Sequence, residues 1–151
     1  MLRGSAGAVY APRVFDETSE FGARAALRLR EDSAIWLTTV APDGTPQPTP
    51  VWFLYDGSKS VLIYSQPNQA KLRNVAHNGR ASLNLDGNRH GGNIVVCHGD
   101  IVISDDPAVD QAPAYLEKYR ERISGLGQTL EQFAALFTVS LRFTITHVRG
   151  H

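Results

Sequence analysis

The sequence predicts a mainly β domain with flanking helices, in which six antiparallel strands close into a barrel. Short apolar runs rich in Val, Ile, Leu and aromatic residues recur along the chain, and tight turns such as Asp43-Gly44 and Asp56-Gly57 separate the first of them. Strands that are joined by short turns pair in the antiparallel sense. Closing six such strands into a barrel removes the exposed edges that an open sheet would leave.

Length and composition indicate a single soluble domain. The chain has 151 residues, 42% of them hydrophobic, and 15 basic side chains balance 15 acidic ones. We expect a flexible arm over residues 1–15 and one domain over residues 16–151. The balanced charge argues against nucleic acid as a partner, and no apolar run is long enough to span a membrane. The single Cys97 suits a reducing, cytoplasmic environment.

The first third of the chain predicts one helix and three strands. Asp16 is a suitable N-cap for a helix that runs to about Arg30. Strands are expected over residues 34–40, 46–55 and 60–65. The second of these carries three alternating prolines, which cannot donate to a ladder, so it must be an edge strand or turn those nitrogens away from its partner. The three are Pro46, Pro48 and Pro50.

The middle of the chain predicts a short helix between two further strands. Asn68 is a suitable N-cap for this helix, and Asn78-Gly79 ends it. Residues 81–85 alternate as a strand, and residues 94–104 form a long strand. Gly99 in the long strand indicates a bulge or a close approach of another backbone segment.

The last third predicts two helices and a final strand. Asp105 or Asp106 caps a helix that begins with Pro107 in its first turn and runs to about residue 123. A shorter helix is expected over residues 130–137. Residues 140–148 form the last strand. One face of that strand carries Leu141, Phe143 and Ile145, with His147 as a further candidate.

The stretch YSQPNQAKLRN, residues 64–74, raises the first functional question. Lys71 falls in the first turn of the expected helix, where the helix dipole disfavours a cation. First-turn N–H groups, Lys71 and the nearby Ser65, Asn68 and Gln69 could together bind a phosphate. The alternative is that Lys71 and Arg73 only face solvent. The spacing alone leaves both interpretations open.

The order of these motifs resembles that of one known family. The run from AIWLTTV to ASLNL, followed by GDIVISDDP and FTITHVRG, resembles the pyridoxamine-phosphate-oxidase-like split β-barrel family, and within it the deazaflavin branch that uses coenzyme F-420. The resemblance covers roughly residues 16–150. It implies a six-stranded antiparallel split β-barrel of the FMN-binding type, and a homodimer with two cofactor sites at its interface.

The resemblance also implies which residues hold the cofactor. Lys71 would meet the cofactor phosphate, with help from Ser65 and from the backbone around Asn68 and Gln69. The segment Thr49–Trp52 would lie along the tricyclic ring, and Trp52 and Tyr64 are candidates to pack against that ring, although Trp52 could equally be a plain core aromatic. The implied cofactor-binding residues are Ser65, Asn68, Gln69, Lys71, Arg73, Asn74, Pro50, Val51, Trp52 and Tyr64.

Departures from the family pattern favour coenzyme F-420 over FMN. FMN-dependent oxidases of the family carry an Arg-Lys pair in this loop, and Ala70 stands at the Arg position. Their vitamin B6 members carry Arg-x-His in the last strand, whereas this chain has His147 followed by Arg149, the reverse order. A vitamin B6 oxidase is therefore disfavoured. FMN remains the alternative cofactor.

We therefore expect a coenzyme F-420-dependent oxidoreductase that transfers a hydride to a small organic substrate. The sequence identifies no catalytic residue, and only His98 and Tyr64 are candidates for a proton donor. The alternative from another class is a carrier or binding protein for flavin, deazaflavin or haem that does no chemistry. A metal site is not expected, because Cys97 and His98 are adjacent on a strand and point to opposite faces.

Overall fold

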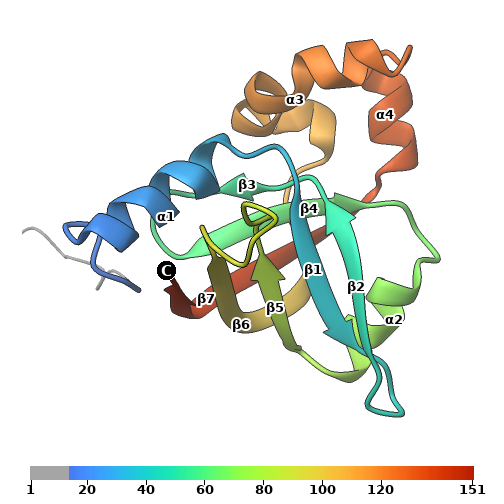
Figure 1. Cartoon of the computed structure of the whole chain (residues 1–151). Helices are drawn as coiled ribbons and strands as arrows, with labels where there is room; N and C mark the ends of the chain where they lie inside the picture. The colour runs from blue at the N-terminus through green and yellow to red at the C-terminus, as the bar shows by residue number, and fades with distance from the viewer. Residues whose placement is uncertain (1–13) are drawn as a thin grey trace, which may run out of the picture.

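Seven β-strands form one curved sheet in the order β2-β1-β5-β6-β7-β4-β3 in the computed structural model, which describes residues 14–151 (Figure 1). The strands are β1 (Ile35–Val40), β2 (Pro46–Val51), β3 (Leu54–Tyr55), β4 (Ser60–Ser65), β5 (Arg80–Asn84), β6 (Val95–Ser104) and β7 (Val139–Gly150). The helices are α1 (Glu20–Glu31), α2 (Ala70–His77), the 3-10 turn η1 (Val109–Gln111), α3 (Pro113–Gly125) and α4 (Leu130–Leu136). The expected arm over residues 1–15 lies almost entirely outside the described residues.

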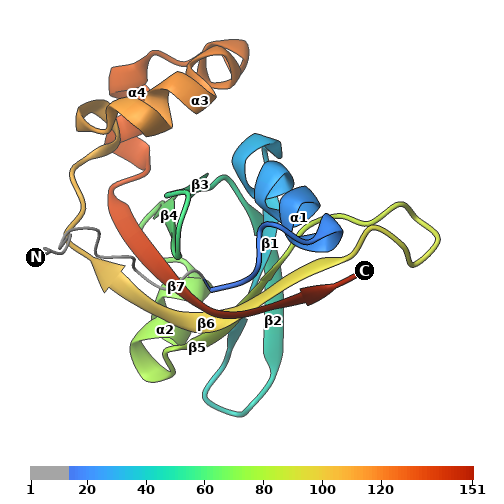
Figure 2. The same ribbon diagram turned by 90° about the vertical axis from the view of Figure 1, so that its left-hand side faces the viewer.

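The barrel expectation is confirmed, but the number of strands is wrong by one. All neighbouring strands pair antiparallel, and the sheet curves around a common interior (Figure 2). The strand expected over residues 46–55 is interrupted at Trp52 and Phe53, so that β2 and β3 lie at opposite edges of the sheet. The three alternating prolines lie on edge strand β2, as their missing N–H groups require.

Strand β4 separates two hydrophobic cores. All six of its residues are buried, because one face points into the barrel and the other is covered by helices. Val61 and Ile63 belong to the barrel core, whereas Leu62 and Tyr64 belong to a second core beneath α3 and α4. Figure 1 shows these two helices lying together on the side of the sheet where β3 and β4 run. The second core fixes the helices over one end of the barrel.

Two of the helix starts differ from the expected ones. Ser19, not Asp16, caps α1, and its hydroxyl oxygen accepts the N–H of Gly22 at 2.9 Å. The N-cap of α2 is Gln69, which makes no capping bond through its side chain. Asn68 has a φ of 63°, a left-handed conformation, whereas an N-cap residue has extended backbone. Lys71 still falls in the first turn of α2, as expected.

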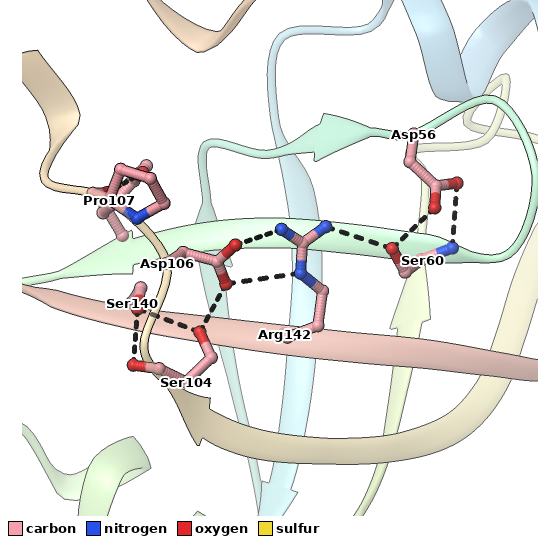
Figure 3. Close-up of polar contacts among 8 residues, drawn as sticks. Asp56, Ser60, Ser104, Asp106, Pro107, Ser140 and Arg142 are labelled. Carbon is pink, nitrogen blue, oxygen red and sulfur yellow. Dashed lines mark hydrogen bonds and ion pairs between the residues drawn. The ribbon is translucent and has the colours of Figure 1, made fainter. Parts of the chain in front are cut away.

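The helix expected at Pro107 begins six residues later. Pro113 is the first residue of α3 and Ala112 is its N-cap, so the preference for proline at the first helical position operates at a different proline. Asp106 is not a cap, because its carboxylate is engaged elsewhere. Figure 3 shows it turned toward Arg142 of β7.

The Arg142 network ties three parts of the chain together (Figure 3). The guanidinium of Arg142 forms an ion pair with Asp106, and its Nη1 donates to the Ser60 hydroxyl of β4 at 3.1 Å. Ser60 donates in turn to Asp56 at 2.7 Å, and Ser104 of β6 donates to Asp106 at 2.6 Å. The hydrogen bonds from Arg142, and then that from Ser104, hold the pKa of Asp106 below its usual value. The network fixes the segment that leaves β6 toward α3.

A bulge in β7 explains why His147 does not join the core. His98 pairs with His147 and Gly99 pairs with Ile145, so Thr146 is an extra residue between them. Ile145 stays buried, but the shift in alternation leaves His147 exposed. The expectation that His147 shares the core face is therefore wrong, whereas the irregularity expected at Gly99 is confirmed.

We predict that Gly99→Ala strongly destabilises the fold. A Cβ atom at this position would lie 2.0 Å from the carbonyl oxygen of Thr144 and 2.9 Å from the Phe143 ring. The backbone must shift to relieve such a contact, and we expect a loss of about 3 kcal/mol in the free energy of unfolding. Gly125→Ala, where nothing lies within 4 Å, is the matched control. Denaturant unfolding of both variants tests this prediction. Equal unfolding midpoints for the two variants would contradict it.

Asp106→Asn should cost about 1 kcal/mol at neutral pH, since it weakens a partly exposed ion pair. Because the folded-state pKa of Asp106 is lowered, its contribution is complete above the unfolded-state pKa of about 4 and is lost as the pH falls further. The stability difference between the two proteins should therefore shrink below about pH 4. Asp105→Asn, at the exposed neighbouring position, serves as control. A difference that stays constant between pH 7 and pH 3 would argue against the role of the Arg142 network.

Candidate functional site

A pocket of about 290 Å³ lies between the end of β2, strand β4, helix α2 and the α3–α4 pair. Its volume is near the lower limit for ligand pockets and suits one ring system. Five of the residues expected to bind a cofactor line this pocket, although they come from three separate segments. The lining residues are Ala34, Pro50, Val51, Trp52, Tyr64, Lys71, Tyr115, Leu126, Phe133 and Phe137.

Among the described residues, 14–151, Lys71 is the only charged one that lines the pocket. It is the second residue of α2 and is half-buried. Burial lowers the pKa of its ammonium group, because a charge loses hydration there. Among residues 14–151 no carboxylate or other side chain pairs with it. Lys71 is therefore a cation without a counter-ion, beside the unpaired N–H groups of a helix start.

Trp52 forms the wall between the pocket and the helices. Its indole stacks on Tyr119 with ring centroids 4.8 Å apart and planes 4° apart. It also stacks on Phe133, at 5.6 Å and 16°. The two interpretations of Trp52 therefore do not exclude each other, because the side chain packs in the second core and also lines the pocket.

The hydroxyl of Tyr64 is already committed to the protein. The side chain is 5% exposed, and its hydroxyl donates to the carbonyl oxygen of Pro107 at 2.5 Å. Its ring meets Tyr115 edge to face at 4.9 Å. Burial, followed by the charge of Asp106, raises the pKa of the phenol. Tyr64 can thus shape the pocket, but its proton is engaged.

Two further expected cofactor residues are buried away from the pocket. Ser65 is 1% exposed, and its hydroxyl donates to the carbonyl oxygen of Gln66 at 2.8 Å. Asn74 is 3% exposed, and its amide donates to Thr39 at 3.0 Å and to Gln47 at 2.7 Å. The Asn74 contacts attach α2 to β1 and β2. The Ser65 contact is local, to the next residue, whereas the Asn74 contacts hold the helix that carries Lys71.

The remaining three expected residues lie on the exposed surface around the start of α2. Asn68 and Gln69 precede the helix, and their side chains are exposed. Arg73 is exposed as well, and its Nη1 approaches the carbonyl oxygen of Asn68 at 3.5 Å. None of the three lines the pocket. Their part in cofactor binding stays a prediction.

His98 lies on the outer face of the sheet, away from the pocket. It lines a separate cavity of about 510 Å³ with residues of β1, β5 and β7. Its Nε2 accepts a hydrogen bond from Nε of Arg149 at 3.0 Å, and its ring lies 6.0 Å from that of His147. Within the described part of the chain, no three His, Cys, Asp or Glu side chains gather as metal ligands.

Sequence reasoning missed the helical wall of the pocket. Tyr115 comes from α3, Leu126 follows that helix, and Phe133 and Phe137 come from α4 and its C-cap. A sequence signal for this wall does exist, since Tyr115 and Tyr119, like Phe133 and Phe137, are four residues apart and fall on one helix face. The signal gives no indication of which strand that face covers.

Comparisons with known proteins agree with this architecture. The family model described as pyridoxamine 5'-phosphate oxidase matches residues 22–151. A search of curated proteins found no match. None of the helices described in residues 14–151 has the length and apolar character needed to cross a membrane.

Three solved structures share the fold at low sequence identity. A candidate pyridoxamine 5'-phosphate oxidase from Listeria innocua is 19% identical with a TM-score of 0.63, covering 84% of this chain and 94% of that one. An F-420 reductase is 21% identical with a TM-score of 0.61, covering 80% and 92%. A conserved hypothetical protein from Mycobacterium tuberculosis is 22% identical with a TM-score of 0.63, covering 87% and 82%. These likenesses establish the split β-barrel fold.

Proposed function

The chain belongs to the pyridoxamine 5'-phosphate oxidase family, and from that premise we propose that it is a coenzyme F-420-dependent oxidoreductase acting on a small organic substrate. The observation that carries the proposal is the position of Lys71. An unpaired, half-buried cation at the start of a helix lines an otherwise uncharged pocket. The similarity of the fold to that of an F-420 reductase supports the choice of cofactor.

A cofactor phosphate would stabilise the charge of Lys71 more than water does. In the free protein, the helix dipole and partial burial both oppose the positive charge. An anion at the start of α2 reverses both effects, since it pairs with the ammonium group and accepts the N–H groups of the first turn. The residues that would hold the phosphate are Lys71 and the backbone around Gln69.

The remainder of the pocket suits a flat ring. Pro50, Val51 and Trp52 form one apolar wall as the chain leaves β2, and Tyr64 contributes from β4. When bound, the deazaflavin supplies the hydride chemistry. The protein contributes binding, orientation and exclusion of water from the ring.

FMN is the second candidate for the cofactor, because the family includes FMN-dependent oxidases. Ala70 stands where those oxidases carry a second cation, and it occupies the first position of α2 beside Lys71. Fewer cations reduce the stabilisation available to the doubly charged phosphate monoester of FMN. Coenzyme F-420 is therefore the preferred cofactor.

The homodimer that the family resemblance implies is part of the proposal. Apolar side chains are exposed near the end of β6, where Val102 is 56% and Ile103 is 50% exposed, and Trp36 on the outer face of β1 is 37% exposed. Ile94 and Val96, near the start of the long strand, are partly exposed. A partner chain over such residues would remove apolar surface from water.

We expect sedimentation velocity at micromolar concentration to give a dimer. Val102→Glu should shift the distribution toward monomer, because a buried charge at an apolar interface is costly. Glu117→Gln, an exposed change on α3, should leave the distribution unaltered. A monomer for the unmodified chain would remove this part of the proposal and leave the pocket argument standing.

Lys71→Ala tests the proposed function directly. We expect coenzyme F-420 to bind ten- to a hundredfold more weakly, about 1.5–3 kcal/mol, because a hydrogen bond to a charged group is lost. The cofactor-free variant should be as stable as the parent or a few tenths of a kcal/mol more stable, since an unfavourably placed charge is gone. Fluorescence titration and thermal unfolding measure the two effects.

Arg73→Ala is the matched control, because Arg73 lies on the same helix but is exposed. It should reduce affinity less than Lys71→Ala does. If neither substitution changes the affinity for coenzyme F-420 or FMN, Lys71 is only a surface cation and the proposal fails. Tighter binding of FMN than of coenzyme F-420 to the unmodified protein would replace the cofactor and retain the site.

A further inference from the structure

Lys118 of α3 is a half-buried lysine that lies against aromatic rings. Its Nζ donates to the carbonyl oxygen of Phe53 at 2.9 Å, and it lies 3.8 Å from the centroid of the Phe53 ring and 5.3 Å from that of Tyr119. Within the described part of the chain, no carboxylate forms an ion pair with it. Asp32, at the end of α1, acts on Lys118 through its charge but is already paired with Arg28 at 2.7 Å. The amine is therefore partly shielded from water and has only a neutral carbonyl as its partner.

These surroundings favour the neutral form of the amine. A lysine that loses hydration without gaining a counter-ion gives up its proton more easily and becomes a nucleophile. In agreement with this geometry, burial lowers the pKa of Lys118 to about 8, and the charge of Asp32 opposes that change only in part. An unperturbed lysine has a pKa of about 10.4. The neighbouring Tyr119 hydroxyl, which shares the Phe53 oxygen, stays protonated, because burial raises its pKa.

We propose that Lys118 is a modification site whose amine takes an acyl group from an activated donor such as an acyl phosphate, and that this acylation alters the wall of the pocket. In the reaction, the electron pair of the amine nitrogen forms a bond to the carbonyl carbon of the donor. The bond from that carbon to the phosphate oxygen breaks, and phosphate leaves with the electron pair. The nitrogen then loses one proton to water, and a neutral amide remains. The product carries no charge, so the fold no longer holds a poorly hydrated cation at this position.

Acylation of Lys118 reaches the pocket through the connection between β2 and β3. The amide loses the attraction between a cation and the Phe53 ring, and it keeps only one N–H for the Phe53 oxygen. The added acyl group also needs room between α3 and this connection. Trp52 precedes Phe53, stacks on Tyr119 and lines the pocket. A shift of the connection therefore moves a residue that a ligand would touch, whichever ligand the pocket binds.

The test treats the full chain with acetyl phosphate at neutral pH and follows each lysine by mass spectrometry of peptides. The chain has only three lysines, Lys59, Lys71 and Lys118, so each rate can be resolved. Lys59, exposed in the turn before β4, is the matched control. We expect Lys118 to react about tenfold faster than Lys59, because more of its amine is neutral. In guanidinium chloride, where the chain is unfolded, the two rates should become equal.

The dependence on pH gives a second check of the site. In the folded protein the rate at Lys118 should level off above about pH 8, whereas in the unfolded chain it should keep rising toward about pH 10. Equal rates at Lys118 and Lys59 in the folded protein overturn the inference, and so does a preference for Lys118 that persists on unfolding.

The effect on the pocket is measured by fluorescence in the background Trp36→Phe, where Trp52 is the remaining tryptophan. We expect acetylation to shift the Trp52 emission. The shift should be absent after the same treatment of Lys118→Arg, which keeps the positive charge and offers no lysine amine at this position. That variant also controls for acetylation of Lys71 in the pocket. An unchanged emission after complete acetylation of Lys118, or an equal shift in Lys118→Arg, would overturn the link to the pocket wall. None of these measurements requires coenzyme F-420, so failure of the proposed function would leave them decisive.

Discussion

The site depends on how the chain between β2 and β3 is held, because Phe53 leaves the sheet with its backbone groups in need of partners. The hydroxyl of Tyr119 accepts the N–H of Phe53 at 2.8 Å and lies 2.8 Å from the carbonyl oxygens of Phe53 and Ser33. Lys118 donates to the same Phe53 oxygen at 2.9 Å, and burial lowers the pKa of its ammonium group to about 8. Helix α3 thereby replaces the missing ladder bonds. Trp52 stacks on Tyr119, adds to this contact between α3 and the β2–β3 connection, and forms the pocket wall.

The contact between α3 and the β2–β3 connection also explains which parts of the fold could be predicted. Strands with local turns followed from periodicity and from Asp-Gly pairs, since both signals are contained in neighbouring residues. The break at Trp52 and Phe53 could not be predicted, because its cause is a tyrosine hydroxyl 66 residues away. The prediction that Asp106 caps a helix failed for a similar reason, because its actual partner, Arg142, is 36 residues away. Local rules fail where a distant side chain satisfies the group that the local rule would have used.

The residues of the site also divide into those that neighbouring sequence could indicate and those that it could not. Lys71 was identified because the helix dipole disfavours a cation at a helix start. This conflict can be recognised from a few neighbouring residues. The family resemblance indicated four further residues, and in the structure they line the same pocket as Lys71. They are Pro50, Val51, Trp52 and Tyr64. The helical wall was missed, because an aromatic pair on a helix indicates a buried face but not the surface that this face covers. Tyr115 belongs to that wall.

Lys71 and the aromatic wall prepare the pocket for a ligand in two different ways. Lys71 remains charged at a cost in stability, and that cost is recovered only when an anion arrives. Tyr115 belongs to the wall, and the rings of Tyr64 and Tyr119 pack against it. Because the aromatic wall is packed before any ligand binds, little conformational entropy of that wall is lost on binding. A charged donor near the helix start and an apolar wall together match a ligand that is anionic at one end and apolar at the other.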